Sequence, residues 1–416
     1  MSKRYHRGKS WQLSLRPGVT VLEVLFATGI AVFGMVGIAS LLAVGGRQAS
    51  DANNWSEGQA AAQNALSDFV VRDYNNSAYW STFIDQITGT LPAHFVNYRS
   101  MGTVLRGTST GGVREVNRYA VCIDPYFFSD PTTVANVLNE FANTQPYRPG
   151  LFPYFQDNFD PLNPGTLLGF NAGRLLRVGL KTGPSSTDGL LPVKAVDRQF
   201  QLLDDLAIDV DEDDKTLPAG RFFSEGAAQG LTKGEYSWFA TLCPREVTSL
   251  IEVPNTISPE NLFTLSIVVC KRRDRAFYLP ERDAGGNQTQ ESPIGERVVT
   301  VTHTTNFNGG SGGRVVLSAA RDEGNPAQDI SESLRAGDWV MLCREQLSNG
   351  VLETRCRWYR VLTLDIETDI SAGTSWSRSV ILDGPDWVFN APGSGPTQAT
   401  LVSNVVTVVE RVVSVR

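Results

Sequence analysis

Four groups of residues in this sequence have the chemistry for a functional site: an acidic cluster, a glycine-flanked serine, a cysteine pair and an isolated glutamate. The acidic cluster contains Asp209, Asp211 and Asp213, and carboxylate oxygens are ligands that Ca²⁺ prefers. Its spacing departs from an EF-hand loop, because Asp214 stands where glycine is needed. We therefore expect a solvated acidic loop, with these aspartates as the one calcium candidate and no other cofactor.

The serine candidate is Ser311, in the sequence GGSGG at 309–313, which matches the G-x-S-x-G pattern of nucleophilic serines. That pattern needs a helix directly after the serine, whereas residues 314–317 are strand-like. The chain contains only 3 histidines that could act as general bases. We expect a hairpin tip at this position and a protein that is not an enzyme.

Cys343 and Cys356 flank a strong hairpin signal, Asn349 followed by Gly350. A two-residue turn there places the cysteines directly opposite each other at a non-hydrogen-bonded position, where Cα atoms are about 4.5 Å apart. This separation is just inside disulfide range, and an oxidising compartment favours the bond. The alternative is two buried thiols. Because the chain has 5 cysteines, at least one lacks an intramolecular partner, and the pairing of Cys122, Cys243 and Cys270 stays open.

Glu23 is the one charged residue in the apolar run 19–44. As a helix this run would be about 39 Å long, which exceeds the roughly 30 Å hydrocarbon core of a bilayer. A carboxylate inside such a segment is costly and is usually functional. A basic block precedes the run and predicts a cytoplasmic N-terminus with an exported body; it consists of Lys3, Arg4, Arg7, Lys9 and Arg16.

Residues 16–23, which read RPGVTVLE, resemble the class III signal of type IV prepilins and type II secretion pseudopilins. The resemblance implies that a prepilin peptidase cuts after Gly18 and N-methylates Val19, which leaves Glu23 as the fifth residue of the mature chain. Val19 stands where Phe or Met is usual, and Pro17 precedes the glycine. These departures bear on methylation more than on cleavage.

The resemblance also implies a location and a set of partners. The protein would cross the bacterial inner membrane once, with its head in the periplasm or on an extracellular fibre. Its partners would be prepilin peptidase, other pilin or pseudopilin subunits and the assembly platform of a pilus or secretion system. Glu23 would neutralise the N-terminal amine of a neighbouring helix in an apolar fibre core. Small residues would let such helices approach closely: Ala27, Gly29, Ala31, Gly34, Gly37 and Ala39.

Two other interpretations of the N-terminus are a cleaved secretory signal and a plain signal anchor. The apolar run is about twice as long as the ~7–15 residues of a secretory signal, which disfavours cleavage behind it. A plain anchor predicts a periplasmic binding or scaffolding protein that does not join a fibre. The large head favours a minor subunit or a tip position within the pilin interpretation.

Beyond the apolar run, residues 47–72 have helical spacing, and residues 75–77 (NNS) mark the helix end. Short strand-like runs then alternate with Gly/Pro turns. We expect an α+β chain with a leader (1–18), a pilin-type helix (19–75, with 19–44 transmembrane), a β-rich head with a long insertion (76–280), a linker (281–296) and a C-terminal β module (297–416).

The charge of the body excludes one class of partner. Five of the 37 basic residues lie in 1–18 without an acid, so the rest of the chain holds 32 basic and 44 acidic residues, a net charge of −12. Nucleic-acid binding depends on neutralising phosphates with basic side chains. We expect no nucleic-acid partner.

Overall fold

The computed structural model describes residues 20–84, 94–97, 120–129, 150–156, 174–185, 188–201, 236–245, 262–273, 295–303, 305–320, 334–348, 351–365, 375–389, 391 and 394–416. The chain divides into two compact units, Met1–Asn54 and Trp55–Arg416. Helix α1 (Val21–Val71) begins in the first unit and ends in the second. Its end at Val71 agrees with the end predicted by the asparagines that follow.

In the first unit, α1 carries a stretch, Val21–Leu42, that is long and apolar enough to cross a membrane. Its side chains are exposed, and none of the stretch is buried inside the chain. The predicted apolar N-terminal helix and the predicted β-rich body are thus both present.

The second unit begins with an open sheet of eight strands, here called sheet A. Its path runs β15-β8-β7-β3-β6-β1-β2, with β4 also paired to β6, and β3–β6 is the parallel pair. The strands are β1 (Trp80–Ile84), β2 (His94–Asn97), β3 (Val121–Ile123), β4 (Leu151–Phe152), β6 (Leu175–Leu180), β7 (Tyr236–Pro244), β8 (Leu262–Lys271) and β15 (Val405–Ser414).

One face of sheet A is covered by the end of α1 and by α6 (Val193–Phe200). Phe69 of α1 and Phe200 of α6 pack there against alternate residues of β7, such as Trp238. Helix α1 lies so close to β15 that a Cβ at Gly58 would come within 2.7 Å of the Val406 side chain. Glycine at this position therefore allows the helix to pack on the strand. Two short helical segments, η1 (Ser77–Tyr79) and α3 (Pro125–Ser129), complete this part.

The second β module is a closed barrel of six strands. The order is β10-β13-β12-β11-β14-β9, and β9 also pairs with β10, which closes the ring. Its interior is apolar and contains Val340, Leu342 and Tyr359. The strands are β9 (Glu296–His303), β10 (Gly313–Ala320), β11 (Trp339–Ser348), β12 (Val351–Leu364), β13 (Ser375–Asp383) and β14 (Gln398–Val402), while β5 (Phe155–Gln156) adds to β9 from outside.

The barrel is an insertion between two neighbouring strands of sheet A. Strands β8 and β15 pair antiparallel from Leu262↔Ser414 to Cys270↔Val405, although the whole barrel lies between them in sequence. The barrel's first and last strands also pair, so its two ends lie together, as is usual for an inserted domain. The structure therefore places the last strand, expected in the C-terminal module 297–416, in sheet A.

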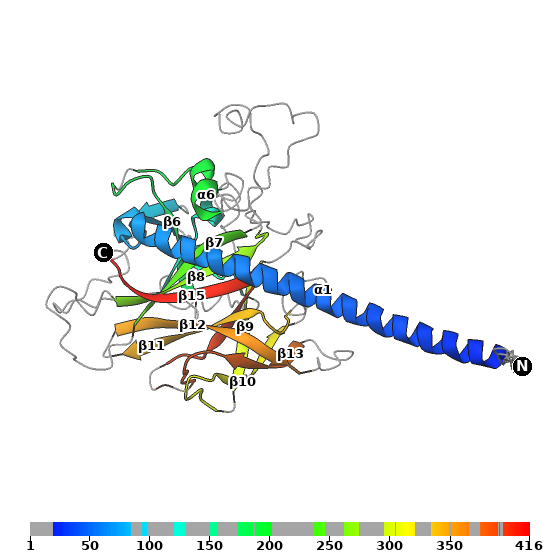
Figure 1. Cartoon of the computed structure of the whole chain (residues 1–416). Coiled ribbons are helices and arrows are strands. Elements are labelled where there is room, and N and C mark those ends of the chain that lie inside the picture. The colour runs from blue at the N-terminus through cyan, green and yellow to red at the C-terminus, as the bar shows by residue number, and fades with distance from the viewer. Residues whose placement is uncertain are drawn as a thin grey trace, which may run out of the picture. The chain divides into compact units, whose positions relative to one another are not determined.

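The outer face of β11 and β12 packs against the second face of sheet A, through Met341 and Trp358 on one side and Phe239 and Val268 on the other. Figure 1 shows the barrel strands on the side of β7, β8 and β15 opposite the end of α1. Residues 274–294, which include most of the expected linker 281–296, lie outside the described residues. Glu296 already belongs to β9.

Candidate functional site

Glu23 lies in the first turn of α1. Its backbone N–H donates to the carbonyl oxygen of Thr20 at 3.0 Å and to Thr20 Oγ1 at 3.3 Å, so Thr20 caps the helix. A carboxylate in the first turn interacts favourably with the helix dipole. The hydroxyls of Thr28 and Ser40 donate to backbone carbonyls within the helix, Ser40 to Gly37 at 2.8 Å. Glu23 is the only ionisable side chain between Gly18 and Gly46.

Glu23 shares one face of α1 with small residues. Ala27, Ala31 and Gly34 follow it at i+4, i+8 and i+11, which is the spacing of a single helix face. Apart from the adjacent turns of the helix itself, no atom of the described residues lies within 4 Å of a Cβ built at Gly34. Gly29 lies on the far side of the helix and is equally open. A second helix could therefore approach closely on the face that carries the carboxylate.

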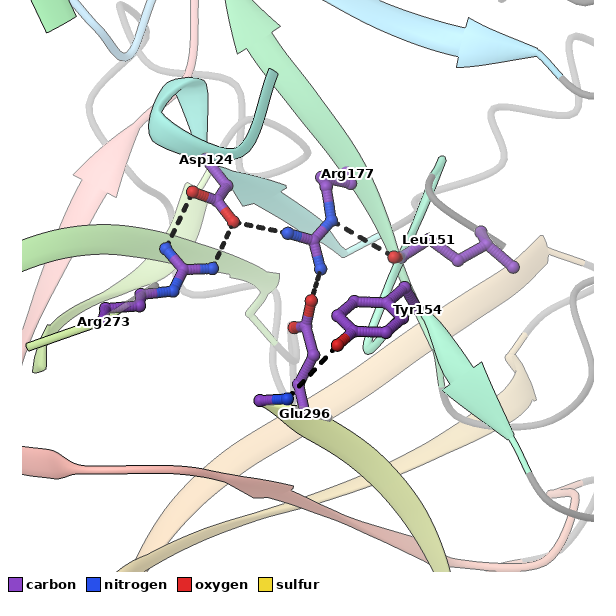
Figure 2. Close-up of polar contacts among 7 residues, drawn as sticks. Asp124, Leu151, Tyr154, Arg177, Arg273 and Glu296 are labelled. Atoms are coloured by element: carbon purple, nitrogen blue, oxygen red, sulfur yellow. Dashed lines mark hydrogen bonds and ion pairs between the residues drawn. The ribbon is translucent and has the colours of Figure 1, made fainter. Parts of the chain in front are cut away.

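The second group of functional interest is a buried ion network, shown in Figure 2. Asp124 directly follows β3, Arg177 lies on β6, Arg273 follows β8 and Glu296 begins β9. Arg177 Nη1 donates to Asp124 Oδ2 at 2.5 Å, and Arg177 Nη2 donates to Glu296 Oε1. Arg273 binds both oxygens of Asp124, at 2.9 and 2.6 Å. Two guanidinium groups thus neutralise two carboxylates.

Alternation along β6 explains why an arginine is buried there. Leu176 and Val178 point into the core under α1, so Arg177 points the other way, into the layer between sheet A and the barrel. Its Nε donates to the carbonyl oxygen of Leu151 at 3.2 Å, and its guanidinium lies 5.3 Å from the ring centre of Phe152. The side chains of Arg177 and Asp124 are both 0% exposed.

The network joins sheet A to the barrel. Asp124, Arg177 and Arg273 come from sheet A, and Glu296 is the first barrel residue. Beside it the Gly295 N–H donates to the Tyr154 hydroxyl at 3.2 Å. Burial raises the pKa of Glu296, and the charges of Arg177 and Arg273 oppose that effect. Removing one member of a buried ion pair strongly destabilises the fold, because the charge of the other member stays uncompensated.

The cysteine register is confirmed. Strand β11 ends at Ser348, β12 begins at Val351, and Cys343 lies directly opposite Cys356. The Cys356 N–H points away from β11 and donates to Cys243 Sγ at 2.9 Å, as expected of a non-hydrogen-bonded position. All five cysteines are free thiols in the structure, so the expected disulfide between Cys343 and Cys356 is not formed in it. Instead, Cys243 accepts the hydrogen bond of the Cys356 backbone N–H beside this pair.

Several sequence candidates lie outside the described residues: Gly18, Val19, Asp209, Asp211 and Asp213. In the described part of the chain, no three His, Cys, Asp or Glu side chains are grouped to hold a metal ion. Gly309, Gly310 and Gly312 adopt positive φ in the connection between β9 and β10, which fits the expected hairpin tip around Ser311.

The sequence analysis predicted neither the ion network nor the position of Cys243. The members of the network are far apart in sequence, and Arg273 stands in a basic run that resembles a solvated strand end. The one available signal was Arg177 inside the apolar run LLRVGL. A charged residue in a buried strand indicates a partner, although it does not say which.

The chain thus consists of a β-rich body with an inserted barrel and an apolar N-terminal helix. No protein-family model, no curated protein and no solved structure matches this chain.

Proposed function

We propose that this chain is a minor pilin- or pseudopilin-like subunit, which a prepilin peptidase processes after Gly18. The mature helix would then wait in the inner membrane and assemble into, or at the tip of, a type IV pilus or type II secretion pseudopilus. The role is structural and not catalytic. The partners are other subunits and the assembly platform.

The observation that carries the proposal is the face of α1 formed by Glu23, Ala27, Ala31 and Gly34. Every large side chain around it from Val21 to Leu42 is apolar and exposed in the single chain. A bilayer can cover the apolar side chains, but it leaves Glu23 without a counter-charge. A neighbouring helix whose new N-terminal amine lies beside Glu23 provides that charge, and the small residues allow the approach.

The size of the body supports a minor position. The compact unit Trp55–Arg416 contains both sheet A and the inserted barrel. A subunit repeated along a fibre is crowded by its neighbours, which favours small heads. A large two-module head therefore fits a tip or a low-copy position better than the repeating one.

The first test is the intact mass and N-terminal sequence of the protein from purified membranes. A start at Val19 with one added methyl group supports the pilin-type pathway. A start at Met1 or Ser2 would instead favour the alternative, a signal-anchored periplasmic binding or scaffolding protein. A start beyond Val44 would mean an ordinary secreted protein and would end the assembly proposal.

The second test measures incorporation into sheared fibres. We expect Glu23→Ala and Glu23→Val to be cleaved normally but to be lost from the fibre fraction. Wild-type amounts of either variant in fibres would contradict the role of Glu23.

A pair of glycine variants provides the matched control. Gly34→Leu adds bulk to the face of Glu23, and Gly29→Leu adds the same bulk to the opposite face. Because both positions are open in the single chain, neither change disturbs α1 itself. We expect Gly34→Leu to reduce incorporation and Gly29→Leu to leave it near the wild-type level.

A further inference from the structure

All five cysteines have buried side chains in the layer between sheet A and the barrel. Two of them, Cys122 and Cys270, lie near the ion network. Burial raises the pKa of both thiols; the charge of Asp124 adds to this effect at Cys122, and the charge of Arg273 opposes it at Cys270. The other three come from the end of β7, from β11 and from β12: Cys243, Cys343 and Cys356.

Cys356 lies between two other thiols, Cys343 and Cys243. Cys343 lies directly opposite it in the β11–β12 hairpin. Cys243 approaches from sheet A and accepts a hydrogen bond from the Cys356 N–H at 2.9 Å, and the two thiols also hydrogen-bond to each other. The Cys243 thiol lies 3.6 Å from the carbonyl oxygen of Thr354, on the same edge of β12.

Both pairs are within reach of a disulfide, but their geometry differs. A directly opposed pair at a non-hydrogen-bonded position has Cα atoms about 4.5 Å apart, at the short end of the roughly 4.4–6.8 Å range of disulfides. Cys243 Sγ is 2.9 Å from the Cys356 nitrogen, so with an N–Cα bond of about 1.46 Å it lies within about 4.4 Å of Cys356 Cα. Rotation of side chains can therefore join Cys243 to Cys356.

We propose that Cys356 is shared between two alternative disulfides, and that the favoured one joins it to Cys243 and so links sheet A covalently to the barrel. The bond from Cys343 closes a loop within one hairpin, whereas the bond from Cys243 closes a much longer loop that contains β8 to β11 and the start of β12. In the chain-entropy account, a disulfide that closes the longer loop stabilises more.

The exchange between the two disulfides needs no external oxidant. The Cys243 thiolate attacks the Cys356 sulfur, the bond from Cys356 to Cys343 breaks, and Cys343 leaves as a thiolate that takes up the proton given by Cys243. In the reduced protein burial raises the pKa of Cys243, but hydrogen bonds from Cys356 and the charge of Arg357 outweigh burial and lower it to about 7. In the disulfide between Cys343 and Cys356 the Cys356 sulfur has no proton to donate, so the Cys356 N–H and the charge of Arg357 are the groups that favour the nucleophilic Cys243 thiolate.

The first disulfide requires an oxidant, which is a disulfide-bearing donor such as oxidised glutathione or a dithiol oxidase of the exported compartment. Two protein thiols lose two protons and two electrons, and the donor's disulfide is reduced to two thiols. In the cell this step rests on the proposed export of the body to an oxidising compartment. The pairing preference itself depends only on the fold, so it is tested on the purified protein.

The test is a disulfide map of the full chain in detergent. The protein is reduced, equilibrated with equal concentrations of reduced and oxidised glutathione, trapped by alkylation at low pH and digested with trypsin. The three cysteines fall in separate peptides, residues 234–245, 336–344 and 356–357. We expect linkage of Cys243 to Cys356 at least tenfold above linkage of Cys343 to Cys356. A map dominated by Cys343 and Cys356, or one with three free thiols, would overturn the proposal.

Three variants separate the bond from simple loss of a core thiol. Cys343→Ala should keep the bond from Cys243, and Cys243→Ala should shift the bond to Cys343. Cys270→Ala removes a thiol from the same buried layer and should leave the map unchanged. Reduction should lower Tm by roughly 5 °C in the wild type and in Cys343→Ala. An unchanged Tm on reduction in both would also contradict the proposal.

The same map on protein from native membranes tests export separately. The bond from Cys243 in glutathione buffer, together with free thiols in membrane protein, would support the pairing and contradict the proposed location of the body. The two failures are therefore distinguishable.

Discussion

Glu23 and Glu296 are both carboxylates among apolar side chains, but they differ in burial and in the cations that lie near them. Glu296 is buried between sheet A and the barrel, where Arg177 binds it directly and Arg273 adds a second nearby charge. Glu23 lies on the exposed apolar part of α1, and no Lys, Arg or His lies between Gly18 and Gly46 to compensate it. Folding supplies Glu296 with counter-charges, whereas Glu23 needs a counter-charge from outside its own segment. This difference separates a residue that holds the body together from one that can select a partner.

The largest expected effect comes from removing the shared cation of the network. Arg177→Met keeps much of the volume but leaves Asp124 and Glu296 with reduced compensation in a buried layer. We expect the free energy of unfolding to fall by about 3–5 kcal/mol, measured by urea denaturation. The matched control is Arg314→Met, whose ion pair with Asp365 spans 3.9 Å between side chains that are 59% and 55% exposed. That change should cost about 0–1 kcal/mol; equal losses in the two variants would contradict the comparison.

A smaller effect is expected from Glu296→Gln. The amide keeps the shape and one acceptor for Arg177, while Asp124 still binds both arginines. We expect a loss of about 1–3 kcal/mol in the free energy of unfolding at pH 7. A loss larger than that of Arg177→Met would show that Glu296, and not the arginine, is the centre of the network.

Glu345 on β11 is a half-buried carboxylate that forms no ion pair with the residues that the structure describes. Its Oε1 has no hydrogen bond, and burial raises its pKa to about 7 from an ordinary value of 4.5. The folded state therefore binds this proton more tightly than the unfolded state. The resulting stability is present below pH 4.5 and is lost as the pH rises through about 7.

Glu345→Gln cannot ionise, so it should remove this pH dependence. We expect the variant to gain roughly 1–2 kcal/mol relative to the wild type between pH 5 and pH 8, because the side chain is partly solvated. Urea denaturation at the two pH values measures the gain. The measurement at pH 5, where Glu345 is largely protonated, is the control. An equal difference between variant and wild type at both pH values would refute the assignment.

The smallest effect should come from Glu23→Gln. Because the body contains its own counter-charges, this change should alter the free energy of unfolding of the body by no more than about 0.5 kcal/mol. Thermal unfolding of the full chain in detergent measures it. A clear destabilisation of the body would mean that Glu23 has a partner inside the chain, and the contrast with Glu296 would disappear.

The local features of the fold could be predicted because their causes are local. The apolar run predicts the helix, and the asparagines after Val71 predict its end. The hairpin between β11 and β12 follows from Asn349 and Gly350, since a two-residue turn fixes the register of both strands. The strands β7 and β8 follow from their apolar composition.

Three other features could not be predicted, because each depends on segments that meet only after folding. The return of β15 to β8 spans the whole barrel, and the Val-rich end of the chain is equally compatible with either module. The closure of the barrel needs the pairing of β9 with both β10 and β14. The approach of Cys243 to Cys356 joins residues from different modules.

The sequence by itself determined that Glu23 is a lone charge in a segment able to cross a membrane, because composition and spacing are written in consecutive residues. It also determined that Cys343 faces Cys356, because turn geometry propagates along paired strands. Only the tertiary structure decided which arginines neutralise Glu296 and which second thiol meets Cys356. Charge and thiol partners are set by distance in space: β3, β6, β8 and β9 bring the charges together, and β7 and β12 bring the thiols together, from sites far apart in the chain.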